Sequence, residues 1–214
     1  MSHSRLKTTL LASALALAGT ANAATTLLSE GFDSVYTLAS HGWVLTNNSS
    51  PGGTTGWFTG EDFLFPSQDG TGGYAAANFN NAAAGGTIDN WLITPQFSTA
   101  NNGHVSLWLR GLANPDFPDT VKFGFSNGDS ATSAFTTGTL VTATGDWTEY
   151  SFAYVAGGAG SMGRFAIEYT GSADVSNYIG VDTLSITAVP EPATWAMFAF
   201  GAAALVARRR RSAR

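Results

Sequence analysis

Two acidic residues, Glu30 and Asp182, have the sequence context of carboxylates that point into a protein core. Each alternates with apolar residues in a short predicted strand, Glu30 in residues 25–32 and Asp182 in residues 178–187. Because side chains along a strand point alternately to opposite faces, both carboxylates are expected on the apolar, core-facing side. A buried carboxylate costs free energy unless it is paired, hydrogen-bonded or bound to a metal.

A structural calcium ion would compensate both carboxylates. Ca²⁺ prefers carboxylate and carbonyl oxygens and accepts a flexible geometry. The sequence therefore predicts one structural Ca²⁺ bound by Glu30 and Asp182, with Asp33 or Asp89 as further candidate ligands. Two alternatives stay open: a β-bulge at Asp182 and Thr183 that turns the carboxylate outward, or a carboxylate that caps a turn.

Trp108 is the candidate ligand-binding residue. It alternates with His104, Ser106 and Arg110, on the opposite side of a predicted strand from three aliphatic residues. An exposed Trp beside an Arg can stack on a sugar or anchor a protein partner. The alternative is that a neighbouring strand or loop covers it.

Catalytic chemistry has little support. The body of the chain has two histidines and no cysteine, so a zinc site would need help from carboxylates and a Ser-His-Asp triad would need one of these histidines. A glycosidase needs only two carboxylates, and the pairs Glu61 with Asp62 and Asp116 with Asp119 are available. Acidic loop residues are usually just solvated, so we predict a protein that is not an enzyme, with a small secreted polysaccharide hydrolase as the alternative.

Short alternating runs provide the elements that would position these residues. Such runs occupy residues 104–110, 121–125, 150–154 and 165–169, with Gly and Asn turn signals between them. No apolar stripe of helical period and length is found between residues 24 and 189. About ten short strands are expected, which predicts an all-β fold, a β-sandwich of jelly-roll type over residues 24–188.

The N-terminus has the build of a secretory signal peptide. Two cations precede the apolar run 10–18, which is too short to span a bilayer comfortably, and Ala21 and Ala23 provide the small residues that signal peptidase requires. We therefore predict a signal peptide at residues 1–23. The alternative is a retained membrane anchor.

The C-terminus contains three parts in a fixed order. A Pro-Glu-Pro sequence is followed by the uncharged run 193–207 and then by a cluster of arginines; the residues are Pro190, Glu191, Pro192, Arg208, Arg209, Arg210 and Arg211. The apolar run is shorter than the roughly 17–25 residues of a stable transmembrane helix. The arginines would hold its end on the cytoplasmic side of an inner membrane. A short transmembrane helix with transient membrane insertion is predicted, with an ordinary tail anchor as the alternative.

Residues 189–214 resemble the PEP-CTERM sorting signal. The resemblance implies an exosortase, a membrane protease that removes the tail during export, as the processing partner. It also implies that Pro190, Glu191 and Pro192 are recognition residues and that the helix and arginine cluster are a temporary stop. The expected location is the cell surface or extracellular matrix of a Gram-negative-type bacterium.

The body resembles the choice-of-anchor J domain, which is related to the cleaved adhesin and other jelly-roll modules. The resemblance rests on landmarks spread along the chain: Ser29-Glu30-Gly31-Phe32-Asp33, Gly42-Trp43, Trp57, residues 89–95 (DNWLITP) and residues 178–186 (YIGVDTLSI). It implies a non-catalytic module associated with surfaces or with carbohydrate or protein binding.

The body of the chain is strongly acidic once both ends are set aside. The whole chain has 10 Lys and Arg against 15 Asp and Glu, a net charge of −5. Residues 24–189 contain three cationic and 14 acidic residues, a net charge of −11; the cations are Arg110, Lys122 and Arg164. Such a domain cannot bind nucleic acid by neutralising phosphates.

These observations predict an exported, non-catalytic surface or matrix protein. Adhesion, or association with extracellular polysaccharide or a surface protein, is the expected role. A small secreted hydrolase and a purely structural coat protein are the alternatives.

Overall fold

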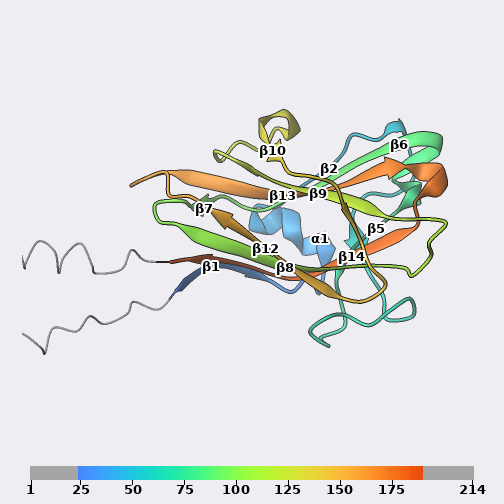
Figure 1. Ribbon diagram of the computed structural model, residues 1–214, viewed down its shortest axis with the longest axis horizontal. Coiled ribbons are helices and arrows are strands. Elements are labelled where there is room, and N and C mark those ends of the chain that lie inside the picture. Colours follow the sequence, from blue (N-terminus) through green and yellow to red (C-terminus); the bar gives the residue numbers. More distant parts are fainter. Residues whose placement is uncertain (1–23, 190–214) are drawn as a thin grey trace, which may run out of the picture. The chain divides into compact units, whose positions relative to one another are not determined.

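Two antiparallel β-sheets make up most of the described protein (Figure 1). The computed structural model describes residues 24–189, which form one compact unit. The predicted signal peptide with its cleavage site at Ala21 and Ala23, and the predicted C-terminal helix, lie outside the described residues.

The first sheet has six strands in the order β12-β8-β14-β5-β4, with β1 also paired to β14. Its strands are β1 (Thr25–Glu30), β4 (Phe58–Thr59), β5 (Ala75–Asn78), β8 (Gly103–Gly111), β12 (Thr148–Tyr154) and β14 (Tyr178–Ala188). Strand β14 is the longest of them and pairs with β8 on one side and with β5 and β1 on the other.

The second sheet has eight strands, arranged mainly as β10-β9-β13-β6-β2. Its strands are β2 (Val44–Asn47), β3 (Ser50–Gly52), β6 (Ala82–Ile93), β7 (Phe97–Ser98), β9 (Thr120–Ser126), β10 (Thr136–Thr137), β11 (Val141–Thr142) and β13 (Met162–Ser172). The helical segments are short: α1 (Val35–Leu38), η1 (Ala39–His41), η2 (Phe79–Asn81), η3 (Thr132–Ala134) and η4 (Ala173–Val175). The predicted all-β sandwich is confirmed.

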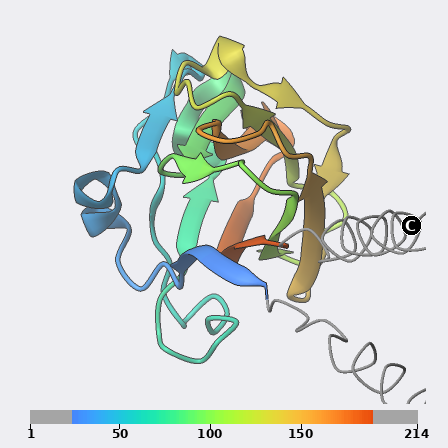
Figure 2. The same cartoon turned by 90° about the vertical axis from the view of Figure 1, so that its left-hand side faces the viewer.

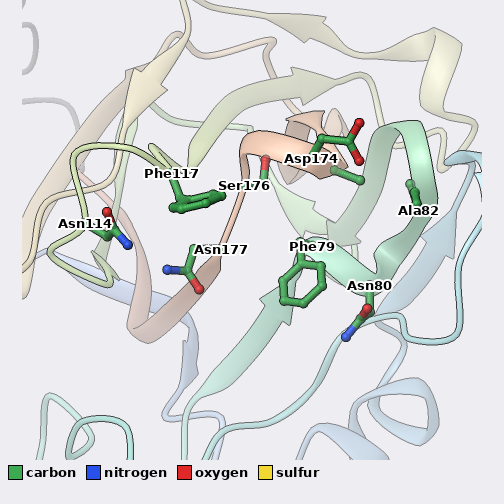
Figure 3. A pocket seen from close by; sticks show the side chains of 10 residues that line it. Phe79, Asn80, Ala82, Asn114, Phe117, Asp174, Ser176 and Asn177 are labelled. Carbon is green, nitrogen blue, oxygen red and sulfur yellow. The ribbon is translucent and has the colours of Figure 1, made fainter.

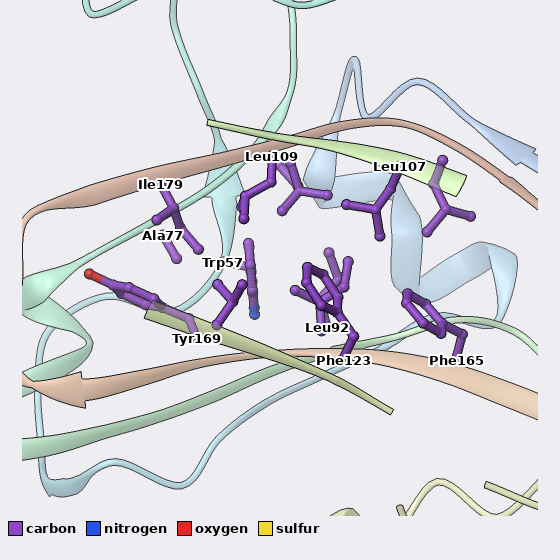
Figure 4. Close-up of a cluster of buried hydrophobic side chains, with 14 of the residues drawn as sticks. Trp57, Ala77, Leu92, Leu107, Leu109, Phe123, Phe165, Tyr169 and Ile179 are labelled. Atoms are coloured by element: carbon purple, nitrogen blue, oxygen red, sulfur yellow. The ribbon is translucent and has the colours of Figure 1, made fainter. Parts of the chain in front are cut away.

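The main core lies between the two sheets, as the turned view and the close-up show (Figures 2 and 4). Leu107 and Leu109 of β8 are fully buried, as the alternation in residues 104–110 predicts, and they lie opposite Phe123 of β9 and Phe165 of β13. Burying side chains of this size contributes about 1.5–3 kcal/mol each. This core sets the relative position of the loops at both ends of the sandwich.

A second, smaller cluster covers the outer face of the six-stranded sheet. The β4–β5 loop (residues 60–74) folds back over this sheet, and its Phe65 stacks on Tyr74 with ring centroids 4.9 Å apart. Tyr178 and Trp147 meet Phe65 edge to face. The Trp147 indole N–H also donates to the Pro66 carbonyl at 2.9 Å, so the loop is fixed by both apolar and polar contacts.

A β-bulge in β14 corrects the predicted direction of Asp182. The register of β14 against β8 shifts between Asp182 and Ser185, and Thr183 has a left-handed backbone with φ of 49°. Asp182 is paired with Trp108, and directly opposed residues share a face, so its carboxylate lies on the outer face under the β4–β5 loop. The expectation that it shares the core-facing side with Leu184 is therefore wrong, because the bulge interrupts the alternation.

Candidate functional site

A pocket of about 430 Å³ lies at the end of the sandwich where β14 begins. Its volume falls in the range of about 300–1,000 Å³ that is typical of small-molecule sites. Three separate segments line it: η2 with the start of β6, the β8–β9 loop (residues 112–119), and η4 with the turn into β14. The principal lining residues are Phe79, Asn80, Asn114, Phe117, Asp174 and Asn177 (Figure 3).

Two phenylalanine rings form the apolar part of this pocket. Phe79 is 44% exposed and Phe117 is 39% exposed, so both rings are accessible to a ligand. In Figure 3 the Asn177 side chain is drawn below the Phe117 ring and to the left of the Phe79 ring. The Phe79 backbone N–H donates to the Asn177 carbonyl at 2.9 Å, which ties the two segments together. Aromatic rings with a polar group beside them suit a ligand with both apolar and hydroxyl faces.

The polar groups of the pocket keep unused hydrogen-bonding capacity. Oδ1 of Asp174 accepts the Gly85 backbone N–H at 2.8 Å, while its second oxygen has no hydrogen bond within residues 24–189. The side-chain amide of Asn177 likewise makes none to other described residues, although its backbone is well anchored. These groups can donate to and accept from a bound ligand.

Asp119 fixes the geometry of the pocket from beneath. It is only 2% exposed, and its Oδ1 accepts the Tyr169 hydroxyl at 2.6 Å and the Asn177 N–H at 2.7 Å. Its Oδ2 accepts the Tyr178 N–H at 3.0 Å. Burial raises the pKa of Asp119, and these three donors offset part of that rise. Because Asp119 follows Phe117 by two residues, it links the loop that carries one wall to the turn that carries Asn177.

This pocket contains no pair of carboxylates of the kind that the hydrolase alternative requires. Asp119 is buried and occupied by three donors, and Asp116 is exposed and does not line the pocket. Glu61 and Asp62 are exposed in the β4–β5 loop. Asp174 is the one acidic residue among the lining residues.

Asp182 is fully buried, and two backbone donors compensate its carboxylate. Its Oδ2 accepts the Gln68 N–H at 2.7 Å, and its Oδ1 accepts the Thr183 N–H at 2.6 Å. Burial nevertheless raises the pKa of Asp182 to about 6, since these hydrogen bonds offset only part of the desolvation cost. The Gln68 side chain also accepts the Thr183 hydroxyl at 2.7 Å, which closes the β4–β5 loop over the bulge.

The other proposed metal ligands are distributed over both sheets. Glu30 is half-buried, and its Oε1 accepts the Phe32 N–H at 3.0 Å. Asp33 and Asp69 both lie 2.7 Å from the Thr71 hydroxyl. Asp89 lies on β6 of the opposite sheet, where it accepts the Trp91 indole N–H, so it does not join Glu30. Within residues 24–189, no group of three or more Asp, Glu or His side chains is gathered for a metal ion.

Trp108 lies on the outer face of the six-stranded sheet, as its alternation in the sequence predicts. It is half-buried, and its register partners are Glu149 of β12 and Asp182 of β14. It does not line the pocket at the start of β14.

The sequence reasoning missed Phe79 and Phe117. Both lie in turns, where no strand periodicity marks them. A signal was nevertheless present: Phe79 stands among asparagines in residues 78–81, and Phe117 stands between Asp116 and Pro118. A large aromatic residue inside a polar turn has no strand partner to bury it, and this identifies a candidate contact residue.

The fold is shared with solved adhesin and carbohydrate-binding domains. The K1 cleaved adhesin domain of Lys-gingipain from Porphyromonas gingivalis is similar with a TM-score of 0.60 and 22% identity, covering 77% of this chain and 98% of that chain. The K3 cleaved adhesin domain of the same protein has a TM-score of 0.57 and 18% identity, covering 77% and 99%. TmCBM61, solved with β-1,4-galactotriose, has a TM-score of 0.50 and 10% identity, covering 73% and 97%. At these identities the similarity establishes the jelly-roll class and no activity.

The PEP-CTERM protein-sorting motif matches residues 188–211. This range contains the Pro-Glu-Pro sequence and the four consecutive arginines. The motif is a sorting signal recognised by an exosortase, so this chain is an exported protein. A comparison with curated protein sequences finds no match. No helix in the described range is long and apolar enough to cross a membrane.

Proposed function

We propose that this chain is a non-catalytic polysaccharide-associating protein that is sorted through the exosortase route to the cell surface or extracellular matrix. The observation that carries the proposal is the pocket, which is lined by two exposed phenylalanine rings and by the free side-chain amide of Asn177. The cleaved adhesin and TmCBM61 similarities support the scaffold.

The position of the pocket suits a surface role. Ser176 and Asn177 line it immediately before β14, and the sorting motif begins at residue 188, where β14 ends. Eleven extended residues separate the two by about 36 Å. A ligand in the pocket would therefore bind far from residue 188, where the sorting motif begins.

The absence of a carboxylate pair supports a binding role over hydrolysis. Glycoside hydrolysis uses two carboxyl groups that flank the scissile bond. The pocket-lining set contains only Asp174, and one of its oxygens is engaged with Gly85. A purely structural coat protein would have no need for two exposed rings beside free amides.

Replacing Phe117 tests this function. Phe117→Ala should lower polysaccharide affinity at least tenfold, because truncating an aromatic anchor costs more than about 1.4 kcal/mol of binding free energy. Phe63→Ala is the matched control, since Phe63 is 78% exposed but lies outside the pocket. The measurement is glycan-array binding of residues 24–189, followed by affinity electrophoresis. If both variants lost polysaccharide affinity equally, or if neither lost any, the pocket would not be the binding site.

We also propose a structural Ca²⁺ at Asp182. Glu30, the other predicted ligand, pairs with the core-facing Leu184 and so lies on the opposite face of the sheet from Asp182. Asp182 has no cationic side-chain partner within residues 24–189, although each of its oxygens already accepts one backbone N–H. The remaining lone pairs, together with backbone carbonyls, would supply the oxygen ligands that Ca²⁺ needs.

The calcium proposal predicts a metal-dependent pH profile. The folded-state pKa of Asp182 is about 6, above the ordinary value of 3.8, so the folded protein binds more protons in this interval. Without metal, the free energy of unfolding should fall by about 1–2 kcal/mol as the pH rises from 3.8 to about 6, and then level off. Millimolar Ca²⁺ should remove this fall and raise the melting temperature, because the cation favours the ionised form.

Thermal melts in chelator and in Ca²⁺ measure both effects. Asp182→Asn should abolish the calcium response, while Asp116→Asn, an exposed control, should keep it. Identical melting curves with and without Ca²⁺ in the unsubstituted protein would rule out the ion.

A further inference from the structure

The pocket has no positive charge near its lining. Its lining residues include no Lys or Arg, and the one charged side chain among them is Asp174. In residues 24–189 the positive residues are Arg110, Lys122 and Arg164, and all three are engaged elsewhere.

The contacts of these three residues lie away from the pocket lining. The Arg110 guanidinium lies over the Phe65 ring, 4.5 Å from its centroid, and its buried Nε has no hydrogen-bond partner among the described residues. Lys122 forms an ion pair with Glu168 at 3.2 Å. Arg164 donates to three backbone carbonyls, those of Gly42, Thr94 and Gly128, at 3.3, 2.6 and 3.1 Å.

We infer that the pocket binds a neutral sugar and excludes anionic polysaccharides; this inference rests on the proposed function and names its ligand class. A uronate or sulfate entering the pocket would meet the Asp174 carboxylate with no Arg or Lys to pair with, inside a domain of net charge −11. Recognition of carboxylate and sulfate groups ordinarily uses the bidentate donors of Arg. No Arg is among the residues that line this pocket.

The polar groups of the pocket match hydroxyl groups. The free oxygen of Asp174 accepts a hydrogen bond from a hydroxyl, and the Asn177 amide can both donate and accept. Phe79 and Phe117, which line the same pocket, would contact the C–H faces of the sugar ring. Hydroxyls need no counter-charge, so binding should be insensitive to salt.

A polysaccharide panel tests the ligand class with residues 24–189. The probes are a neutral galactan and xylan, polygalacturonate as the anionic arm, and chitosan as the cationic arm, each at low and high salt. We expect binding to a neutral polymer that is unchanged by salt, lowered at least tenfold by Phe117→Ala and lowered less than tenfold by Asp174→Asn. The Asn side chain retains an oxygen that can accept the Gly85 N–H.

The other outcomes separate the ligand class from the function itself. Binding of polygalacturonate or chitosan alone, salt-sensitive and lost in Phe117→Ala, overturns the neutral class while the binding function stands. Binding that Phe117→Ala leaves intact, or no binding to any polymer, overturns both. Phe63→Ala controls for general loss of folded protein.

Discussion

Asp119→Ala should lower the free energy of unfolding of residues 24–189 by about 3–5 kcal/mol, the larger of the two main effects expected here. The substitution leaves the Tyr169 hydroxyl and the N–H groups of Asn177 and Tyr178 without their acceptor. An unsatisfied buried donor costs about 1–3 kcal/mol, and the relief of desolvating a carboxylate offsets part of the total. For a domain of this size the melting temperature should fall by about 10 °C.

Urea unfolding with a matched control measures this effect. Asp116→Ala removes an exposed carboxylate from the same loop and should change stability by no more than about 0.5 kcal/mol. If Asp119→Ala were as stable as Asp116→Ala, Asp119 would not be the residue that joins the two walls of the pocket.

Gly53→Ala should both destabilise the domain and disturb the pocket. A Cβ at Gly53 would lie 2.0 Å from the Asn80 carbonyl oxygen and 2.7 Å from the Asn81 carbonyl carbon, and both are backbone atoms that cannot rotate away. The η2 turn would have to move, and it carries Phe79. Crowding of this kind costs about 1–3 kcal/mol, occasionally more.

Gly56→Ala is the control for this substitution. A Cβ at Gly56 meets no atom within 4 Å, so the same chemical change should leave stability and ligand affinity nearly unaltered. Differential scanning calorimetry and the polysaccharide binding assay report the two consequences separately. Equal melting temperatures for the two variants would show that η2 does not depend on close approach at Gly53.

The sandwich could be predicted because its longer strands carry their own signals. In residues 104–110, alternate residues are apolar, and Leu107 and Leu109 are fully buried between the sheets. The two-residue strands β4, β7, β10 and β11 are too short to show an alternation. At Asp182 the sequence left a β-bulge open as an alternative to the core-facing direction, and the structure has that bulge, with a register shift after Asp182 and a left-handed Thr183.

The pocket could not be predicted because it depends on contacts between distant segments. Phe79, Phe117 and Asn177 are brought together by the pairing of β5 with β14 and by Asp119, which is 58 residues away from Asn177 in the sequence. Trp108 could be predicted as a candidate contact residue because strand alternation places its side chain on the outer face of the sheet. The aromatic residues of the pocket lie in turns, where no such alternation marks them. The sorting signal was readable because its three parts are contiguous.

Chemical-shift mapping by NMR would test the central claim, that the turn-borne pocket and not the sheet face is the binding surface. Isotope-labelled residues 24–189 would be titrated with a neutral oligosaccharide while side-chain amide and indole N–H signals are followed. We predict that the side-chain amide signals of Asn177 and Asn114 shift and saturate together, while the Trp108 indole N–H signal does not shift. Saturating movement of Trp108 with Asn177 unchanged would contradict it.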